Sequence, residues 1–293
     1  MTLDANPHDL LIPYTNDFRI GSVETHPPKD TPKKNHLKER LAELITELDE
    51  LQRRFYARDQ RALLLIFQAM DAAGKDSTIR AVMNGVDPAG CYVHSFKQPS
   101  QDELQHDFLW RTTLRQPAKG MIGIFNRSYY EEVLVVRVHP EYLAAQRLPE
   151  AKPSAEFWEQ RLESIRCHEQ HLARNGTVIL KFWLNVSREE QRQRFLSRLE
   201  EADKHWKFNE GDIAEREHWD SYMQAYETAL NATSRPWAPW YAIPADDKPY
   251  MRVCVAEIIV DTLKRMNLDY PELDKDAHKR FKVLEKQLKN EDK

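Results

Sequence analysis

The chain has 293 residues and a mass of 34.6 kDa, which fits one α/β domain with extensions or two small domains. Its net charge of −4 argues against generic nucleic-acid binding, which normally needs a basic surface. No apolar run approaches the roughly 20 residues that span a bilayer, and the amino terminus lacks the layout of a signal peptide. We therefore expect a cytoplasmic protein that binds neither nucleic acid nor membranes.

The first predicted elements run from an irregular arm to a loop between a strand and a helix. Residues 1–35 carry much of the proline and predict the arm. Leucines spaced alternately by four and three residues predict an amphipathic helix over 36–59, which packs on its own domain or on another subunit. The apolar run 61–67 predicts a buried parallel strand. A loop, 68–78, then leads into a helix that ends near Gly85.

Strands and helices continue to alternate along the rest of the chain, which predicts a three-layer α/β domain over 36–271 with a parallel sheet. A charged helical tail is expected over 272–293. Further strands are predicted at 92–96, 121–126, 178–186 and 240–243. Further helices are predicted at 101–115, 154–174, 187–201 and 250–266.

The loop over 68–78, "QAMDAAGKDST", follows the spacing of a phosphate-binding loop with three departures. Ala69 replaces the first glycine, Asp76 takes the hydroxyl position, and Asp71 lies inside the loop. Backbone N–H groups and the start of the following helix would still cradle a phosphate there. The residues predicted to contact phosphate in this loop are Ala72, Ala73, Gly74, Lys75, Asp76 and Ser77.

The two carboxylates of the loop need a separate explanation, because a bare carboxylate opposes a polyanion. Mg²⁺ binds one or two carboxylates together with water and substrate phosphate oxygens. Asp71 is therefore predicted to be a Mg²⁺ ligand or a base that orients the acceptor phosphate, and a turn carboxylate is the structural alternative. Asp76 is expected to cap the helix through backbone N–H groups.

A second group of polar residues follows the strand predicted at 121–126. The carboxyl ends of parallel strands line the ligand crevice of such sheets. Arg127 would then point toward the phosphates near Lys75, with a surface salt bridge as the alternative. Glu131 would hold a second metal ion, contact the acceptor, or remain a solvated carboxylate.

A third cluster follows the strand predicted at 178–186 and forms a lid over about 187–215. Ser187 and Glu190 have the spacing of a capping box at the start of its helix. Four residues separate Arg194 from Arg198, so the two share a helix face. Lys204 and Lys207 flank a tryptophan in the same segment. The lid would close these cations over phosphate groups, and a solvated charged face is the alternative.

The motifs together resemble the polyphosphate kinase 2 family. The stretches "QAMDAAGKDSTIR", "FNRSYYEEVLVVRV", "KHWKF" and "APWYAIPADDK" occur in the family's order, and the resemblance covers roughly 35–270. It implies a thymidylate-kinase-like P-loop kinase fold with a helical lid. It also implies a homodimer or homotetramer that transfers phosphate between inorganic polyphosphate and a nucleotide with Mg²⁺, for which Mn²⁺ can substitute. The catalytic residues it implies are Asp71, Lys75, Arg127, Glu131 and Arg194, with Arg198 as a second lid arginine.

Two positions indicate a branch of that family. Members restricted to diphosphates have Asp and Asn where this chain has Asn126 and Glu131, so the resemblance implies a branch that phosphorylates both AMP and ADP, and the guanine nucleotides with them. The alternatives are an ATP-dependent nucleotide or small-molecule kinase of the P-loop class, and a polyphosphate-binding protein without enzymatic activity.

Overall fold

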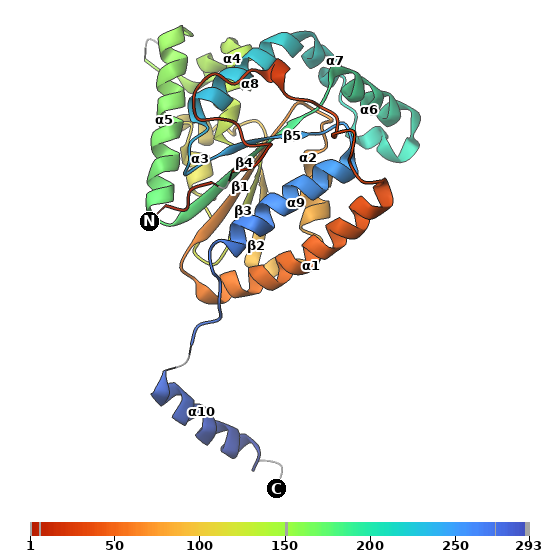
Figure 1. Ribbon diagram of the computed structural model, residues 1–293. Helices are drawn as coiled ribbons and strands as arrows, with labels where there is room; N and C mark the ends of the chain where they lie inside the picture. Colours follow the sequence, from red (N-terminus) through yellow and green to blue (C-terminus); the bar gives the residue numbers. More distant parts are fainter. Residues whose placement is uncertain (1, 6, 150–151, 273, 291–293) are drawn as a thin grey trace.

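The centre of the protein is a five-stranded parallel sheet (Figure 1). The computed structural model describes residues 2–5, 7–149, 152–272 and 274–290, without the side chains of Lys207 and Lys275. The strand order is β2-β3-β1-β4-β5. The strands are β1 (Ala62–Gln68), β2 (Cys91–Ser95), β3 (Ile122–Asn126), β4 (Thr177–Asn185) and β5 (Trp240–Pro244).

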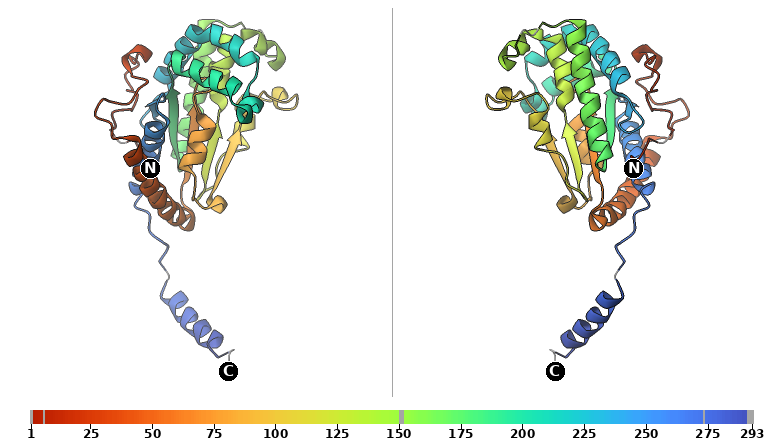
Figure 2. Two further views of the ribbon diagram at one scale, coloured as in Figure 1. Left: turned by 90° about the vertical axis from the view of Figure 1, so that its right-hand side faces the viewer. Right: turned by 90° about the vertical axis from the view of Figure 1, so that its left-hand side faces the viewer.

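Helices cover both faces of the sheet, which gives the three layers that the sequence predicts (Figures 1 and 2). One layer contains α1 (Lys34–Arg58), α2 (Lys75–Val82) and α9 (Lys248–Lys264). The opposite layer contains α5 (Ala155–Arg174) and α8 (Trp219–Thr233). The other helices of the body are α3 (Trp110–Thr113), α4 (Val135–Val138), α6 (Arg188–Glu200) and α7 (Gly211–Glu215). A final helix, α10 (Lys275–Leu288), extends away from the body.

The central strands form where the sequence has uninterrupted apolar runs. Every residue of β1 is buried, as are eight of the nine residues of β4, because helices cover both faces of the sheet. The strands predicted from these runs are confirmed to within two residues. Among the described residues, no helix combines the length and apolar composition that a membrane crossing requires.

The helix predicted over 101–115 is wrong. The segment instead forms a 3₁₀ turn at Glu103–Gln105 and the single-turn helix α3. Between them His106 is extended, and the Asp107 carboxylate accepts the backbone N–H of Leu109 at 2.9 Å. Asp107 thus offers the backbone a local partner that competes with a continuous helix.

The amino-terminal arm protects one edge of the sheet. It runs beside β5, with hydrogen bonds from the Ile12 N–H to the Trp240 carbonyl at 2.9 Å and from the Ala242 N–H to the Leu10 carbonyl at 2.8 Å. An uncovered edge strand would expose backbone groups that can pair with another chain. The arm therefore occupies the edge that β5 would otherwise present.

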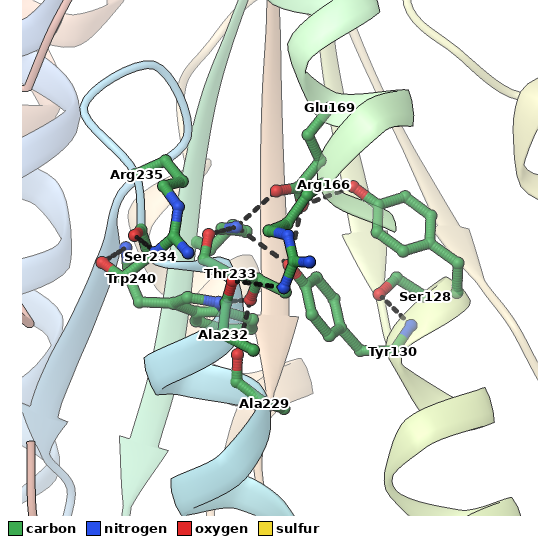
Figure 3. A network of polar contacts seen from close by, with 12 residues as sticks. Ser128, Tyr130, Arg166, Glu169, Ala229, Ala232, Thr233, Ser234, Arg235 and Trp240 are labelled. Carbon is green, nitrogen blue, oxygen red and sulfur yellow. Dashed lines mark hydrogen bonds and ion pairs between the residues drawn. The ribbon is translucent and has the colours of Figure 1, made fainter. Parts of the chain in front are cut away.

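A buried polar network supports the segment that follows β3 (Figure 3). Lys181 on β4 is fully buried, and its ammonium contacts the Glu169 carboxylate at 2.6 Å, the Tyr130 hydroxyl at 2.9 Å and the Thr233 carbonyl at 2.9 Å. The other oxygen of Glu169 accepts the hydroxyls of Tyr129 and Tyr130. Burial lowers the pKa of Lys181 to about 8, and the charge of Glu169 opposes that shift.

We predict that Glu169→Gln lowers the free energy of unfolding by about 3 kcal/mol, because it leaves the buried Lys181 ammonium without its counter-charge. Urea denaturation at pH 7 measures the change. Glu159→Gln is the matched control, since Glu159 pairs with Arg166 at an exposed position and should cost less than about 1 kcal/mol. Equal losses of unfolding free energy in the two variants would show that the buried pair stabilises the protein no more than the exposed pair does.

Candidate active site

A cleft of about 690 Å³ opens at the carboxyl ends of β1 and β3, where the sequence predicts the ligand crevice. Residues from the loop over 68–78 (the phosphate loop), from the end of β3 and from the predicted lid meet there. The predicted site residues that line the cleft are Asp71, Ala72, Gly74, Lys75, Asp76, Ser77, Asn126, Arg127, Arg194, Arg198 and Lys204. Of the other two with described side chains, Ala73 is buried within the loop and Glu131 lines a smaller adjoining pocket.

Lys75 lies under the phosphate loop at the first position of α2. Its side chain is almost fully buried, and its ammonium donates to the carbonyls of Ala69 at 2.8 Å and Met70 at 3.4 Å. Burial lowers the pKa of Lys75 to about 8, with a smaller contribution from the charge of Arg127. Gly74 precedes it with φ of 107°, a left-handed conformation that other residues adopt only with strain.

Arg127 is held between two carboxylates immediately after β3. Its guanidinium contacts Asp71 at 2.6 Å and Glu131 at 2.9 Å. These charges, above all that of Glu131, raise the pKa of Arg127. Its backbone has φ of 65°, which costs a non-glycine residue about 1–3 kcal/mol and often occurs at functional sites. The side chain is still 35% exposed, so the ion pairs leave it facing the cleft.

The helix cap predicted for Asp76 is wrong, because no side-chain cap hydrogen bond forms among the described residues at the start of α2, and the Asp76 carboxylate has another partner that the sequence does not reveal. Asp76 lies in the first turn of α2, and its carboxylate accepts the Asn126 amide at 2.7 Å. The carboxylate thus joins the start of α2 to the end of β3. Beside it the Ser77 hydroxyl donates to the Gly74 carbonyl at 3.0 Å, within the loop itself.

The segment predicted to form a lid consists of α6, a 3₁₀ turn at Ala202–Lys207 and α7, and it brings further charges to the cleft. Arg198 pairs with Asp212 at 3.2 Å. Lys204 contacts the Ser197 hydroxyl at 3.0 Å. Arg194 is buried, and its guanidinium donates to the Ala73 carbonyl at 2.6 Å. The predicted contact of Lys207 lies outside the described side chains.

Sequence reasoning missed three residues of the site. Asp212 on α7 lines the cleft, and burial together with the charge of Asp71 raises its pKa. Lys248 also lines the cleft, from the first position of α9, and lies within the motif "APWYAIPADDK" that could have identified it. Gln191 on α6 is buried against the phosphate loop, and no sequence pattern distinguishes it from the glutamine at 193.

Comparisons with known proteins identify a family and several relatives that this chain resembles. The family model described as Polyphosphate kinase 2 matches residues 31–271. The chain is 49% identical over 283 residues to the ADP-polyphosphate phosphotransferase of Rhodopseudomonas palustris, covering 94% of this chain and 98% of that protein. It is 46% identical over 234 residues to the AMP/ADP-polyphosphate phosphotransferase of Meiothermus ruber, covering 80% and 84%.

A solved structure extends the likeness to the fold. The crystal structure of polyphosphate kinase 2 from Arthrobacter aurescens superposes with a TM-score of 0.86 at 38% sequence identity. The match covers 97% of this chain and 98% of that one. The chain is therefore similar to that enzyme along nearly its whole length.

We predict that the affinity of the cleft for inorganic tripolyphosphate falls as the pH rises from 7 to 9.5. The Lys75 ammonium is protonated below its pKa of about 8 and loses its charge above it. Titration calorimetry without metal ions measures the affinity, and melting temperatures over the same range identify losses caused by unfolding. A folded protein whose affinity stays constant to pH 9.5 would contradict this role of Lys75.

Proposed function

The chain belongs to the polyphosphate kinase 2 family, and we propose that it transfers phosphoryl groups between inorganic polyphosphate and the nucleotides AMP and ADP. The observation that carries the proposal is the concentration of cations in one cleft. Lys75 lies beneath the loop, Arg127 lies at the end of β3, and Arg198 belongs to the lid. A polyanion and a nucleotide phosphate meeting there would both be neutralised.

The residues of the cleft supply the two contributions on which phosphoryl transfer mainly depends, positioning and charge neutralisation. The loop and Lys75 would hold one phosphate group at the start of α2. Arg127 would reach a second one from the end of β3, because its guanidinium is oriented by Asp71 and Glu131. Lid closure would exclude water from the transferring group.

The donor set of the cleft fits Mg²⁺ bound mostly through substrate. Asp71 and Asp212 both line the cleft, and among the described residues no three His, Cys, Asp or Glu side chains gather into a protein-only cage. Mg²⁺ typically uses one or two carboxylates and completes its shell with water and phosphate oxygens. We propose Asp71 as the protein ligand, with Mn²⁺ able to substitute. The ion would neutralise negative charge on the transferred group.

The test of the proposed function incubates the protein with long-chain polyphosphate, Mg²⁺ and either AMP or ADP, without ATP. We expect ADP and ATP from AMP, and ATP from ADP, as measured by chromatography. Product from ADP alone would place Asn126 and Glu131 in a diphosphate-restricted enzyme. No product from AMP, ADP, GMP or GDP would refute the proposal. Transfer from ATP to a non-nucleotide acceptor would favour the ATP-dependent kinase.

We predict that Asp71→Asn lowers kcat by about 10²–10³-fold, the scale of losing one preorganised charge contact. The substitution removes a metal ligand and a partner of Arg127. Initial rates across a Mg²⁺ titration measure the effect. Asp261→Asn, on an exposed position of α9, is the control and should retain wild-type activity. Near-normal turnover and Mg²⁺ dependence in Asp71→Asn would refute the metal role.

We also propose that the protein forms a homodimer or homotetramer, as the family resemblance implies. Sedimentation velocity at micromolar concentration would detect either assembly, and a monomer across the accessible concentration range would refute it.

A further inference from the structure

Two side chains of α6 bind three consecutive carbonyl groups of the phosphate loop. The Gln191 amide donates to the Asp71 carbonyl at 2.9 Å. The Arg194 guanidinium donates through one nitrogen to the Ala72 carbonyl at 3.1 Å and the Ala73 carbonyl at 2.6 Å. Both side chains are buried, Gln191 almost completely. The base of the lid helix is therefore bonded directly to the backbone of the loop.

The remaining donors of Arg194 are also engaged. Its second terminal nitrogen donates to the carbonyls of Ala245 at 2.6 Å and Asp246 at 3.3 Å, between β5 and α9. The Nε group donates to the Glu190 carboxylate at 2.7 Å, so that carboxylate serves Arg194 rather than closing the predicted capping box. A guanidinium has five N–H donors, and five acceptors surround this one. Binding a phosphate would require Arg194 to break one of these contacts.

Gln191 has a second connection, on the lid side. Its amide oxygen accepts from the Arg216 guanidinium at 2.5 Å, and the same nitrogen of Arg216 contacts the Arg188 carbonyl at 3.2 Å. Arg216 follows α7, where the lid returns to the body. One glutamine side chain thus joins the phosphate loop to the start and the end of the lid.

We propose that Gln191 and Arg194 are positioning residues of the phosphate loop and that neither contacts phosphate during transfer. In a planar trans peptide the carbonyl and the following N–H point in opposite directions. Holding the carbonyls of Asp71 and Ala73 toward α6 turns the N–H groups of Ala72 and Gly74 away from it. The inference rests on the proposed phosphoryl transfer and assigns Arg194 a different role from that of a lid arginine closing on phosphate.

The exchange Arg194→Lys distinguishes the two roles. Lysine keeps the positive charge and reaches a phosphate, but it lacks the planar fork that bonds the loop carbonyls and those of Ala245 and Asp246 together. If Arg194 positions the loop, Arg194→Lys lowers kcat by about 100-fold, the scale of a small displacement of catalytic groups. If Arg194 binds phosphate, the lysine variant mainly raises KM for polyphosphate and keeps most of kcat, which would overturn the proposal.

Gln191→Met supplies an independent test, since methionine has a similar size and cannot donate to the Asp71 carbonyl. The proposal predicts a loss of kcat of the same order as for Arg194→Lys in a variant that remains folded at the assay temperature, as its melting curve shows. Matched controls on the exposed side of α6 are Gln193→Met and Arg192→Lys, whose side chains contact Glu189. Unchanged kcat in a folded Gln191→Met variant would overturn the proposal even if Arg194→Lys fails to fold.

A measurement without turnover separates this inference from the proposed function. Hydrogen exchange of the peptide covering 69–77 should become faster in Gln191→Met than in wild type or Gln193→Met, because one loop carbonyl loses its partner. Loop exchange that equals wild type would contradict the positioning role. If the wild-type protein transfers no phosphate but exchange is still faster in Gln191→Met, the positioning role of Gln191 stands and the proposed function fails.

Discussion

The site depends on hydrogen-bond donors for the carbonyl groups of the phosphate loop. A loop that presents N–H groups to an anion turns its carbonyl groups the other way, and buried carbonyls need donors. Here Lys75 binds the first two, and Gln191 and Arg194 bind the next three. This arrangement requires α2 and α6 to begin side by side, which the pairing of β1 with β4 in the sheet provides.

Ion pairs and hydrogen bonds connect the same loop to the core through the turn that follows β3. Arg127 is stabilised by Asp71 and Glu131, although its backbone is strained. The turn that carries Glu131 also carries Tyr130, whose hydroxyl binds Glu169 on α5 in the buried network. Removing Glu169 would leave the buried Lys181 ammonium uncompensated, which costs more than losing an exposed ion pair. The cations of the cleft are thus held in place by carboxylates from several elements.

The sequence predicted the parallel sheet and most of the site because both follow from local patterns. Apolar runs mark β1 and β4, and the Gly74–Lys75 pair marks the loop. Side-chain partners over long sequence distances left no such pattern. Asn126 meets Asp76 across 50 positions, and the sequence does not show that Arg194 faces the loop rather than the substrate. The spacing of apolar residues over 222–233 could have predicted α8, whereas Asp107 overrode the pattern behind the helix predicted at 101–115.

The central claim is that this cleft transfers a phosphoryl group from the end of a polyphosphate chain to a nucleotide, which leaves the chain one phosphate shorter. Phosphorus NMR of polyphosphate and ADP with Mg²⁺ and the protein follows both substrates in one sample. The account predicts that signals of the γ-phosphate of ATP appear as polyphosphate shortens, without matching growth of orthophosphate. Orthophosphate release with no new nucleotide signal would show that the cleft hydrolyses polyphosphate instead, and would contradict the account.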